Sequence, residues 1–188
     1  MKFVIEHLDS RLYAWCFLEY KHIAKSVGKG NALFTNIRRA ADRKRLSAFA
    51  KVEKRRAEEL NLGRVCVLDP EAKVSLKPRD KDRFDSFLFG GILGDCPMQG
   101  RTRELLTSRI KGKTRNLGPE QMSTDTAVIV TKLILQGKPL KSLSFQNTIE
   151  IPIKEGESVE LPFRYLLVDG KPLLPPGLVE HLKHRHNF

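Results

Sequence analysis

The amino-terminal part of the chain carries a strand pattern followed by a helix pattern. Phe3, Val4 and Ile5 form a short apolar run that predicts a first strand. Over residues 10–28 apolar side chains recur every three or four positions, as on one face of a helix: Leu12, Tyr13, Cys16, Phe17, Tyr20, Ile23, Ala24 and Val27. Asp9 or Ser10 is the expected cap of this amphipathic helix, and Gly28 is its expected end.

Strand and helix patterns keep alternating through the middle of the chain. Residues 32–37 predict a second strand, and the following 25 residues up to Gly63 are basic and helical in propensity. Residues 64–68 form a continuous apolar run, as expected of a parallel strand buried on both faces. Further along, the pattern predicts a strand at 87–89, a short basic helix at 101–110 and a buried helix at 126–136. This alternation predicts an α/β fold with helices around a parallel sheet.

After Pro139 the pattern becomes one of short extended segments separated by Gly, Pro and acidic residues. The apolar positions in these segments are Phe145, Ile149, Ile151, Ile153, Val159, Leu161, Phe163 and Tyr165. We expect residues 140–188 to form a β-rich flap over the α/β body. Residues 1–188 then form a single domain, which their number allows.

Two glycine turns, each with an acidic residue, follow predicted strands. The first contains Gly90, Gly91, Gly94 and Asp95, and the second runs from Asn116 to Thr126 and contains Asp125. Glycines permit close approach of a ligand to the backbone, and turns at strand ends often carry binding groups. One such turn alone is more often a simple chain reversal. Two acidic turns within one short stretch favour a binding site, and Asp69 after the strand at 64–68 adds a third carboxylate at the same predicted edge.

The net charge of +12 favours a polyanionic neighbour such as RNA or a ribonucleoprotein, although a generally solvated basic surface is the alternative. The basic residues concentrate in residues 38–64 and 101–115. No run of about 18 apolar residues predicts a membrane span. An acid and a His interrupt the first apolar run too early for a secretory signal, and three widely spaced cysteines favour a reducing compartment, so we expect a cytoplasmic protein.

Three familiar site patterns do not fit. The segment around Gly28 and Gly30 lacks the spacing of a P-loop, and the glycines at 90–94 have neither the spacing nor the position of a dinucleotide-binding motif. His181, His184 and His186 lie close together near the end of the chain, where a solvated tail is a better interpretation than a metal site. We therefore predict no metal.

Three motifs together resemble the SPOUT superfamily of S-adenosylmethionine-dependent methyltransferases. They are Leu68-Asp69-Pro70, Phe89-Gly90-Gly91-Ile92-Leu93-Gly94-Asp95 and Gln121-Met122-Ser123-Thr124-Asp125-Thr126-Ala127. Ile5-Glu6-His7 and Leu161-Pro162-Phe163-Arg164-Tyr165 are similar to the eukaryotic protein-arginine methyltransferase branch of that superfamily. The resemblance covers nearly the whole chain.

The resemblance implies a SPOUT-type α/β knot, in which a parallel sheet flanked by helices carries a carboxy-terminal trefoil knot. Only the resemblance supports a knot, because most protein chains are unknotted. It also implies that S-adenosylmethionine is held in three loops by Leu68, Asp69, Pro70, Phe89, Gly90, Gly91, Ile92, Gly94, Leu117, Gly118, Gln121, Met122, Thr124 and Thr126.

The charge of an arginine substrate sets a further expectation. A guanidinium stays protonated in water and offers only hydrogen-bond donors. Acidic groups must therefore orient it and assist proton loss during methyl transfer. Glu6, Asp95 and Asp125 are the candidate catalytic acids, with Asp69 and Glu160 as further members of an acidic pocket. For Asp125 the alternative is favourable interaction with a helix dipole, because it lies in a predicted first turn.

The leading hypothesis is methylation of a protein arginine, and the resemblance implies a small-subunit ribosomal protein as the substrate. An RNA methyltransferase is the alternative, because the positive charge would serve RNA binding directly. A non-catalytic RNA-binding module would not need the acidic turns. The resemblance also implies a monomer, with residues 140–188 covering the usual dimer face, and the basic segments 38–64 and 101–115 are candidate contacts to rRNA or the ribosome.

Overall fold

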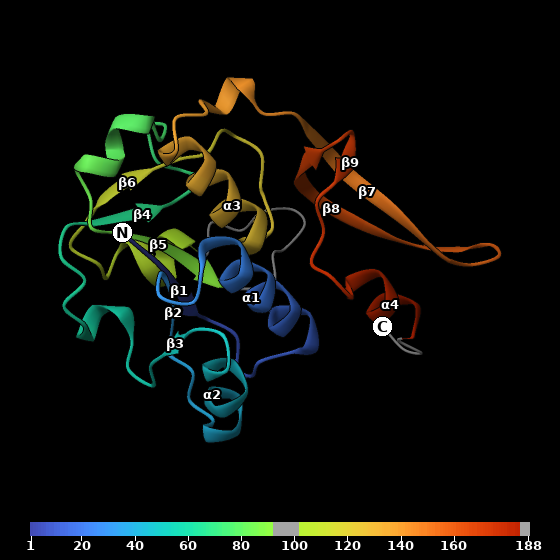
Figure 1. Cartoon of the computed structure of the whole chain (residues 1–188), viewed down its shortest axis with the longest axis horizontal. Helices are drawn as coiled ribbons and strands as arrows, with labels where there is room; N and C mark the ends of the chain where they lie inside the picture. The colour runs from blue at the N-terminus through green and yellow to red at the C-terminus, as the bar shows by residue number, and fades with distance from the viewer. Residues whose placement is uncertain (92–101, 185–188) are drawn as a thin grey trace.

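The computed structural model describes residues 1–91 and 102–184, and its main feature is a six-stranded sheet (Figure 1). The strands are β1 Lys2–His7, β2 Ala32–Thr35, β3 Lys51–Val52, β4 Val65–Leu68, β5 Ser86–Gly91 and β6 Lys113–Arg115. They lie in the order β3-β2-β1-β5-β4-β6, and every neighbouring pair is parallel. The predicted α/β fold with a parallel sheet is confirmed.

Helices and short helical turns cover both faces of the sheet. The helices are α1 Ala14–Val27, α2 Ala40–Ser47, α3 Thr124–Leu135 and α4 Leu178–Lys183, and the shorter turns are η1 Ala57–Glu59, η2 Pro78–Asp82, η3 Arg103–Thr107 and η4 Leu140–Ser142. Helices α1 and α3 lie side by side over the face seen in Figure 1. The second face is covered by residues of η1 and η3, whose Ala57 and Leu106 are buried in a separate core cluster.

The alternation of side chains along β1 divides the core between these two faces. Phe3 and Ile5 belong to the cluster that contains the apolar residues of α1 and α3. Val4 belongs to the cluster on the other face. Because successive side chains of a strand point to opposite faces, Glu6 shares the face of Val4, and His7 shares the face of α1 and α3. This division places the candidate acids of the chain on different sides of the sheet.

Helix α1 begins later than expected, and the prediction of an Asp9 or Ser10 cap is wrong. Its cap position is Tyr13, which makes no side-chain capping hydrogen bond. The reason is that the chain continues beside β5 after β1 ends: the Leu8 N–H donates to the Gly91 carbonyl at 2.9 Å. The predicted end at Gly28 is confirmed, where φ is +88°.

The basic segment up to Gly63 is helical only in α2 and in the single turn η1, so the predicted long helical segment is wrong. Its backbone instead pairs with the extension of β2. The Glu53 N–H donates to Phe34 O at 2.8 Å, and the Asn36 N–H donates to Arg55 O at 2.8 Å. Pairing with a buried strand outweighs helix propensity here.

The buried helix expected at 126–136 is present as α3. The helix expected at 101–110 is reduced, within the described part, to the π-helical turn η3. Gly90 and Gly91 lie within β5 rather than in a turn, and the remainder of the first predicted glycine turn falls outside the described residues. Ser123 occupies the cap position of α3, but its hydroxyl contacts the side chains of Asp125 and Thr126 rather than the backbone.

The carboxy-terminal segment forms a second sheet of β7 Phe145–Lys154, β8 Glu157–Val168 and β9 Lys171–Pro172. Figure 1 shows the long β7–β8 hairpin beside the sheet domain, followed by α4. Tyr165, Leu178 and Leu182 form a core cluster against which Trp15 and Leu18 of α1 pack. The predicted β-rich character of this region is thus present.

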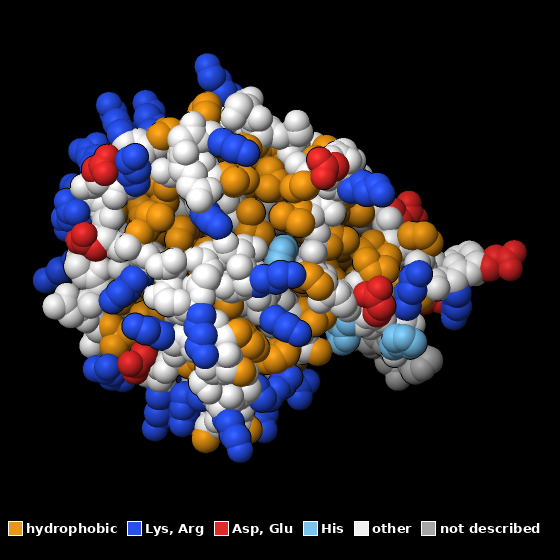
Figure 2. Space-filling view, viewed as in Figure 1, with side chains coloured by type: hydrophobic (Ala, Val, Ile, Leu, Met, Phe, Trp, Pro, Cys, Tyr) orange, Lys and Arg blue, Asp and Glu red, His pale blue; other side chains and the backbone are white. Residues whose placement is uncertain are grey.

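Basic side chains lie along the outer rim of the sheet and over α2, as Figure 2 shows. Arg38, Arg39, Lys44 and Arg45 are exposed. Arg115 is not part of this surface, because it is buried and its guanidinium donates to both oxygens of Asp80 at 3.1 and 3.2 Å. Among the described residues, no helix is long and apolar enough to cross a membrane.

Candidate active site at the carboxyl edge of the sheet

The predicted cofactor loops follow three strands that are neighbours in the sheet. Residues 68–70 end β4, residues 89–91 end β5, and residues 116–126 follow β6. Since β5, β4 and β6 are adjacent and parallel, their carboxyl ends meet at one edge. Two hydrogen bonds link the loops: Asp69 N–H donates to Arg115 O at 2.9 Å, and the Thr124 hydroxyl donates to Gly90 O at 3.5 Å. The fold therefore gathers the described parts of all three predicted segments.

Asp69 shapes the first loop. One carboxylate oxygen accepts the N–H of Glu71 at 2.9 Å, and the other accepts the hydroxyl of Thr107 at 2.7 Å. Asp69 is buried, with 4% of its surface exposed. Its carboxylate thus closes the turn at Pro70 and ties it to η3.

The loop after β6 is closed by the carboxy-terminal hairpin. Gly118 has a φ of +97°, which favours glycine, and Leu117 beside it is buried. The Arg164 N–H of β8 donates to Gln121 O at 2.8 Å, and Met122 forms an isolated bridge with the same residue. Strand β8 is therefore part of the wall beside the predicted cofactor loops.

The two described glycines of the first motif have different surroundings. A Cβ on Gly91 would lie 2.2 Å from the Tyr20 hydroxyl and 2.7 Å from Ile5 Cγ2, so core packing requires this glycine. A Cβ on Gly90 would lie 3.3 Å from Leu8 Cδ1 and 3.6 Å from Thr102 Oγ1. Ile92, Gly94 and Asp95, which the sequence also nominates, lie outside the described residues.

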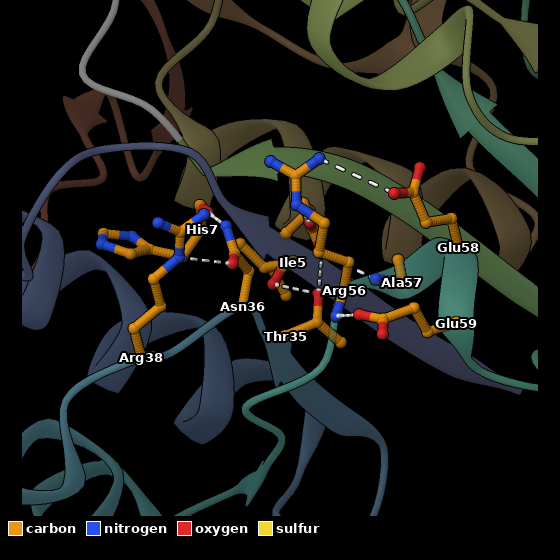
Figure 3. Close-up of polar contacts among 10 residues, drawn as sticks. Ile5, His7, Thr35, Asn36, Arg38, Arg56, Ala57, Glu58 and Glu59 are labelled. Carbon is orange, nitrogen blue, oxygen red and sulfur yellow. Dashed lines mark hydrogen bonds and ion pairs between the residues drawn. The ribbon is translucent and has the colours of Figure 1, made fainter.

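Glu6 is held by contacts within the fold. Its carboxylate accepts the Thr35 hydroxyl at 2.5 Å and the Ala57 N–H at 2.9 Å, and the Arg56 guanidinium lies 3.9 Å away. Figure 3 shows Thr35, Arg56 and Ala57 grouped beside Ile5 of β1. Burial raises the pKa of Glu6, while the Thr35, Ala57 and Arg56 interactions oppose that rise. These donors lie in β2 and at the start of η1, so the Glu6 carboxylate links both elements to β1.

Asp125 lies on the other face of the sheet, in the first turn of α3, and is fully buried. One carboxylate oxygen lies 2.7 Å from His22 Nδ1, and the other accepts the Ser123 hydroxyl at 2.7 Å. The structure therefore does not bring Glu6 and Asp125 together. Glu160, the further candidate, lies on β8 opposite Glu150 of β7.

Sequence reasoning missed three polar residues around Asp125. Glu19 and His22 of α1 and Tyr165 of β8 are buried, with 6%, 7% and 1% of their surfaces exposed. A signal was available for the first two, because an acid and a His lie three positions apart beside the apolar face of the amphipathic helix. Tyr165 lies in an apolar strand pattern and in the Leu161–Tyr165 motif, neither of which predicts a chemical role for its hydroxyl.

The remaining candidate side chains indicate no separate chemistry. Cys16 and Cys66 are buried and unpaired, and burial raises the pKa of the Cys66 thiol to about 12. His181 lies in α4 and His184 follows it, while His186 falls outside the described residues. Within residues 1–91 and 102–184, no cluster of His, Cys, Asp and Glu is arranged to hold a metal ion.

Comparison with solved structures first identifies the class of protein. A Trm10 structure from Thermococcus kodakaraensis matches with a TM-score of 0.56 at 18% identity, over 74% of this chain and 94% of that one. The yeast arginine methyltransferase SFM1 complexed with SAH matches with a TM-score of 0.86 at 35% identity, over 97% of this chain and 94% of that one. The fold is that of the SPOUT methyltransferases.

Sequence comparison narrows this class to one family. The family model described as protein arginine N-methyltransferase SFM1-like matches residues 2–187. The protein arginine N-methyltransferase SFM1 of Saccharomyces cerevisiae is 36% identical over 201 residues, covering 97% of this chain and 94% of the relative. The chain belongs to the SFM1-like family of protein arginine N-methyltransferases.

Proposed function

We propose that this protein transfers a methyl group from S-adenosylmethionine to an arginine side chain of a protein. The observation that carries the proposal is the match to the SFM1-like family from residue 2 to residue 187. The gathering of the described parts of three predicted cofactor loops at one sheet edge supports it independently. The yeast relatives were solved as complexes with SAH and with SAM, which fits the proposed cofactor.

The described loop residues suit a nucleoside-like cofactor. Leu117 and Met122 offer apolar surface, and Gly118 keeps the loop backbone accessible. The proposed cofactor residues are Leu68, Asp69, Pro70, Phe89, Gly90, Gly91, Ile92, Gly94, Leu117, Gly118, Gln121, Met122, Thr124 and Thr126. The cofactor supplies a methyl group that its sulfonium already activates.

The residues of this chain must then orient the guanidine nitrogen and receive its proton. Formation of the N–CH₃ bond breaks the S–CH₃ bond, and the substrate nitrogen loses one proton. We propose Glu6, Asp95 and Asp125 as the acids that serve this step. The contacts of Glu6 favour an indirect contribution to this step, through Arg56 and the end of β1. The buried carboxylate of Asp125, in contrast, lies at the end of a predicted cofactor loop.

We further propose that the substrate is a small-subunit ribosomal protein met on the ribosome in the cytoplasm. The exposed basic residues at α2 and η3, among them Arg39 at the cap position of α2, Arg45 and Arg103, would approach rRNA. This arrangement assigns the net charge of +12 to docking and the acids to the reaction site.

We also propose that the fold carries a carboxy-terminal trefoil knot and that the protein acts as a monomer. The resemblance to the SPOUT superfamily supports the knot. The packing of β8 on the loop at 121–122, and of α4 near α1, supports the monomer because it covers surface beside the proposed site.

The function is tested by incubating the protein with S-adenosylmethionine labelled in the methyl group and a cell extract. We expect label in protein that protease releases and ribonuclease does not, and acid hydrolysis should yield methylarginine. Label that ribonuclease removes and protease leaves intact would instead indicate an RNA methyltransferase. Calorimetry that detects no binding of S-adenosylmethionine or S-adenosylhomocysteine would overturn the proposal.

A further inference from the structure

Three elements bring acidic and phenolic groups together on the α1 side of the sheet. Glu19 comes from α1, Asp125 from the first turn of α3 and Tyr165 from β8. Each is more than nine-tenths buried. Trp15 packs against the same cluster as Tyr165, which places the start of α1 against β8. We call this group the acidic cluster.

Hydrogen bonds inside the acidic cluster leave acceptor capacity unused. Asp125 contacts His22 and Ser123 as described above, and Glu19 Oε1 accepts the Trp15 indole N–H at 3.0 Å. Within the described residues, no recorded hydrogen bond engages Glu19 Oε2, and the buried Tyr165 hydroxyl has no partner. An unsatisfied buried polar group is costly, so the Tyr165 hydroxyl points to a missing ligand, and Glu19 Oε2 is a second acceptor available to that ligand.

The charges of the acidic cluster indicate what that ligand must be. Burial and then the Asp125 carboxylate raise the pKa of Glu19, with a further contribution from Asp9. Burial, then the charges of Asp125 and Glu19, likewise raise the pKa of Tyr165, and α3, which carries Asp125, contacts both α1 and β8. Neither carboxylate has a Lys or Arg partner among the ion pairs of the described residues, and His22 can balance at most one charge. The two buried carboxylates therefore lack at least one positive counter-charge.

A guanidinium matches this deficit in shape as well as in charge. Its five N–H donors form a planar fork, and it has no acceptor. Two carboxylates and a phenolic oxygen offer acceptors from three different elements, α1, α3 and β8. Glu19 keeps 6% of its surface exposed beside the partly buried Trp15, so this residue is not completely sealed from solvent.

The acidic cluster also adjoins the proposed cofactor loops. Asp125 follows Thr124, whose hydroxyl contacts Gly90 O, and Tyr165 follows Arg164, whose N–H contacts Gln121 O. A guanidinium held here would lie next to the loops that are proposed to carry the methyl donor. Glu6 is on the other face and cannot take part in the same cluster.

We infer that Glu19, Asp125 and the Tyr165 hydroxyl form the binding site for the guanidinium of the substrate arginine. This inference rests on the proposed function and adds Glu19 and Tyr165 to the acids that the sequence nominates. Glu19 is then a substrate-binding residue whose buried charge is retained for recognition, at the expense of stability in the free protein.

The test compares Glu19→Gln with Glu155→Gln, which makes the same chemical change at the exposed turn between β7 and β8. Initial rates of methylarginine formation are measured over a series of extract-protein concentrations, with S-adenosylhomocysteine binding by calorimetry and melting temperature alongside. We expect Glu19→Gln to lower the rate at subsaturating protein about 100-fold or more, because a buried guanidinium loses its counter-charge. Cofactor affinity should stay within about twofold of wild type, since the change preserves shape.

Tyr165→Phe provides a second variant that keeps the packing of the ring. We expect about a tenfold lower rate at subsaturating protein from the loss of one acceptor, again with unchanged cofactor binding. The inference is overturned if Glu19→Gln retains the wild-type concentration dependence, or if it loses S-adenosylhomocysteine binding or melts well below wild type. Failure of the wild-type protein itself to form methylarginine would instead refute the proposed function.

Discussion

The two faces of the parallel sheet hold buried acids in opposite conditions. On one face, Glu6 is surrounded by the Thr35 hydroxyl, the Ala57 N–H and the Arg56 guanidinium. On the other face, Glu19 and Asp125 repel each other, and the nearby Tyr165 hydroxyl has no partner within the described residues. The same residue types therefore serve different purposes. An acid with its donors supplied by the fold joins elements, whereas acids that lack a counter-charge await one from outside.

This difference also explains how a protein with a net charge of +12 can offer an acidic site. Its basic residues lie largely on exposed surface, as at Arg38, Arg39 and Arg45. The buried Arg115, on the edge strand β6, already forms an ion pair with Asp80. Consequently no Lys or Arg of the described residues forms an ion pair with Glu19 or Asp125, and the His22 contact reaches only Asp125. The positive charge of the exposed surface and the negative charge of the buried acidic cluster therefore lie in different parts of the molecule.

The largest effect is expected from Asp125→Asn. Removing this buried charge would eliminate one of the two carboxylates available to the guanidinium, and we expect methyl transfer to fall by a factor of about 10² to 10³. Single-turnover rates with labelled S-adenosylmethionine measure this change, and S-adenosylhomocysteine binding by calorimetry reports whether the loop remains intact. Glu155→Gln is again the control at an exposed position. A variant that retained wild-type turnover would break the distinction between the two faces.

The next largest effect is expected on stability, from a substitution at Gly91, the last residue of β5. Gly91→Ala would place a methyl group 2.2 Å from the Tyr20 hydroxyl, and Tyr20 adjoins Glu19 on α1. We expect unfolding free energy to fall by about 1–3 kcal/mol through overpacking, measured by urea denaturation. The neighbouring change Gly90→Ala is a matched control, because its nearest contact would be 3.3 Å from the side-chain end of Leu8.

Tyr20→Phe removes the oxygen with which the new methyl group would collide. Combining it with Gly91→Ala should recover part of the lost stability, although Ile5 Cγ2 at 2.7 Å still opposes the methyl group. Equal stability losses for Gly90→Ala and Gly91→Ala would show that Tyr20 does not determine this position. The result would then argue against tight coupling between the end of β5 and α1.

These positions also show how far the sequence could predict the molecule. The strand and helix order followed from hydrophobic periodicity, as in the buried runs at 64–68 and 126–136. The segment at 38–62 was mispredicted because its backbone pairs with β2 through contacts that local propensity does not encode. Glu19 and Tyr165 were missed for a similar reason: they are far apart in sequence, and only the packing of β8 near α1 and α3 brings them together.

A smaller effect is expected from Glu6→Gln on the opposite face. The amide oxygen can take the place of the carboxylate oxygen that accepts from both Thr35 and Ala57, but the amide NH2 then faces the Arg56 guanidinium, so we expect a loss of about 1 kcal/mol in unfolding free energy. Relief of the buried charge offsets part of this loss, because burial raises the pKa of Glu6. Methylation should show a smaller change in kcat than Asp125→Asn causes, with little change in the KM for protein. A loss of turnover equal to that of Asp125→Asn would place Glu6 at the reacting group.

The smallest effect is a pH dependence of stability that distinguishes Glu19 from an ordinary surface acid. Burial, the Asp125 charge and the Asp9 charge raise the pKa of Glu19 well above its usual value of 4.5, so folding favours the protonated form. The stability that this group contributes is therefore fully present below about pH 4.5 and is lost as the pH rises through its raised folded-state pKa. Glu19→Gln cannot lose this contribution. We expect the variant to gain stability relative to wild type as the pH rises toward neutrality, measured by urea unfolding at a series of pH values.

Glu155→Gln should give a difference in stability from wild type that is flat with pH, since that side chain is exposed. A difference for Glu19→Gln that is equally flat would mean that the Glu19 carboxylate already has a counter-charge in the free protein, and the contrast between the two faces would then no longer hold.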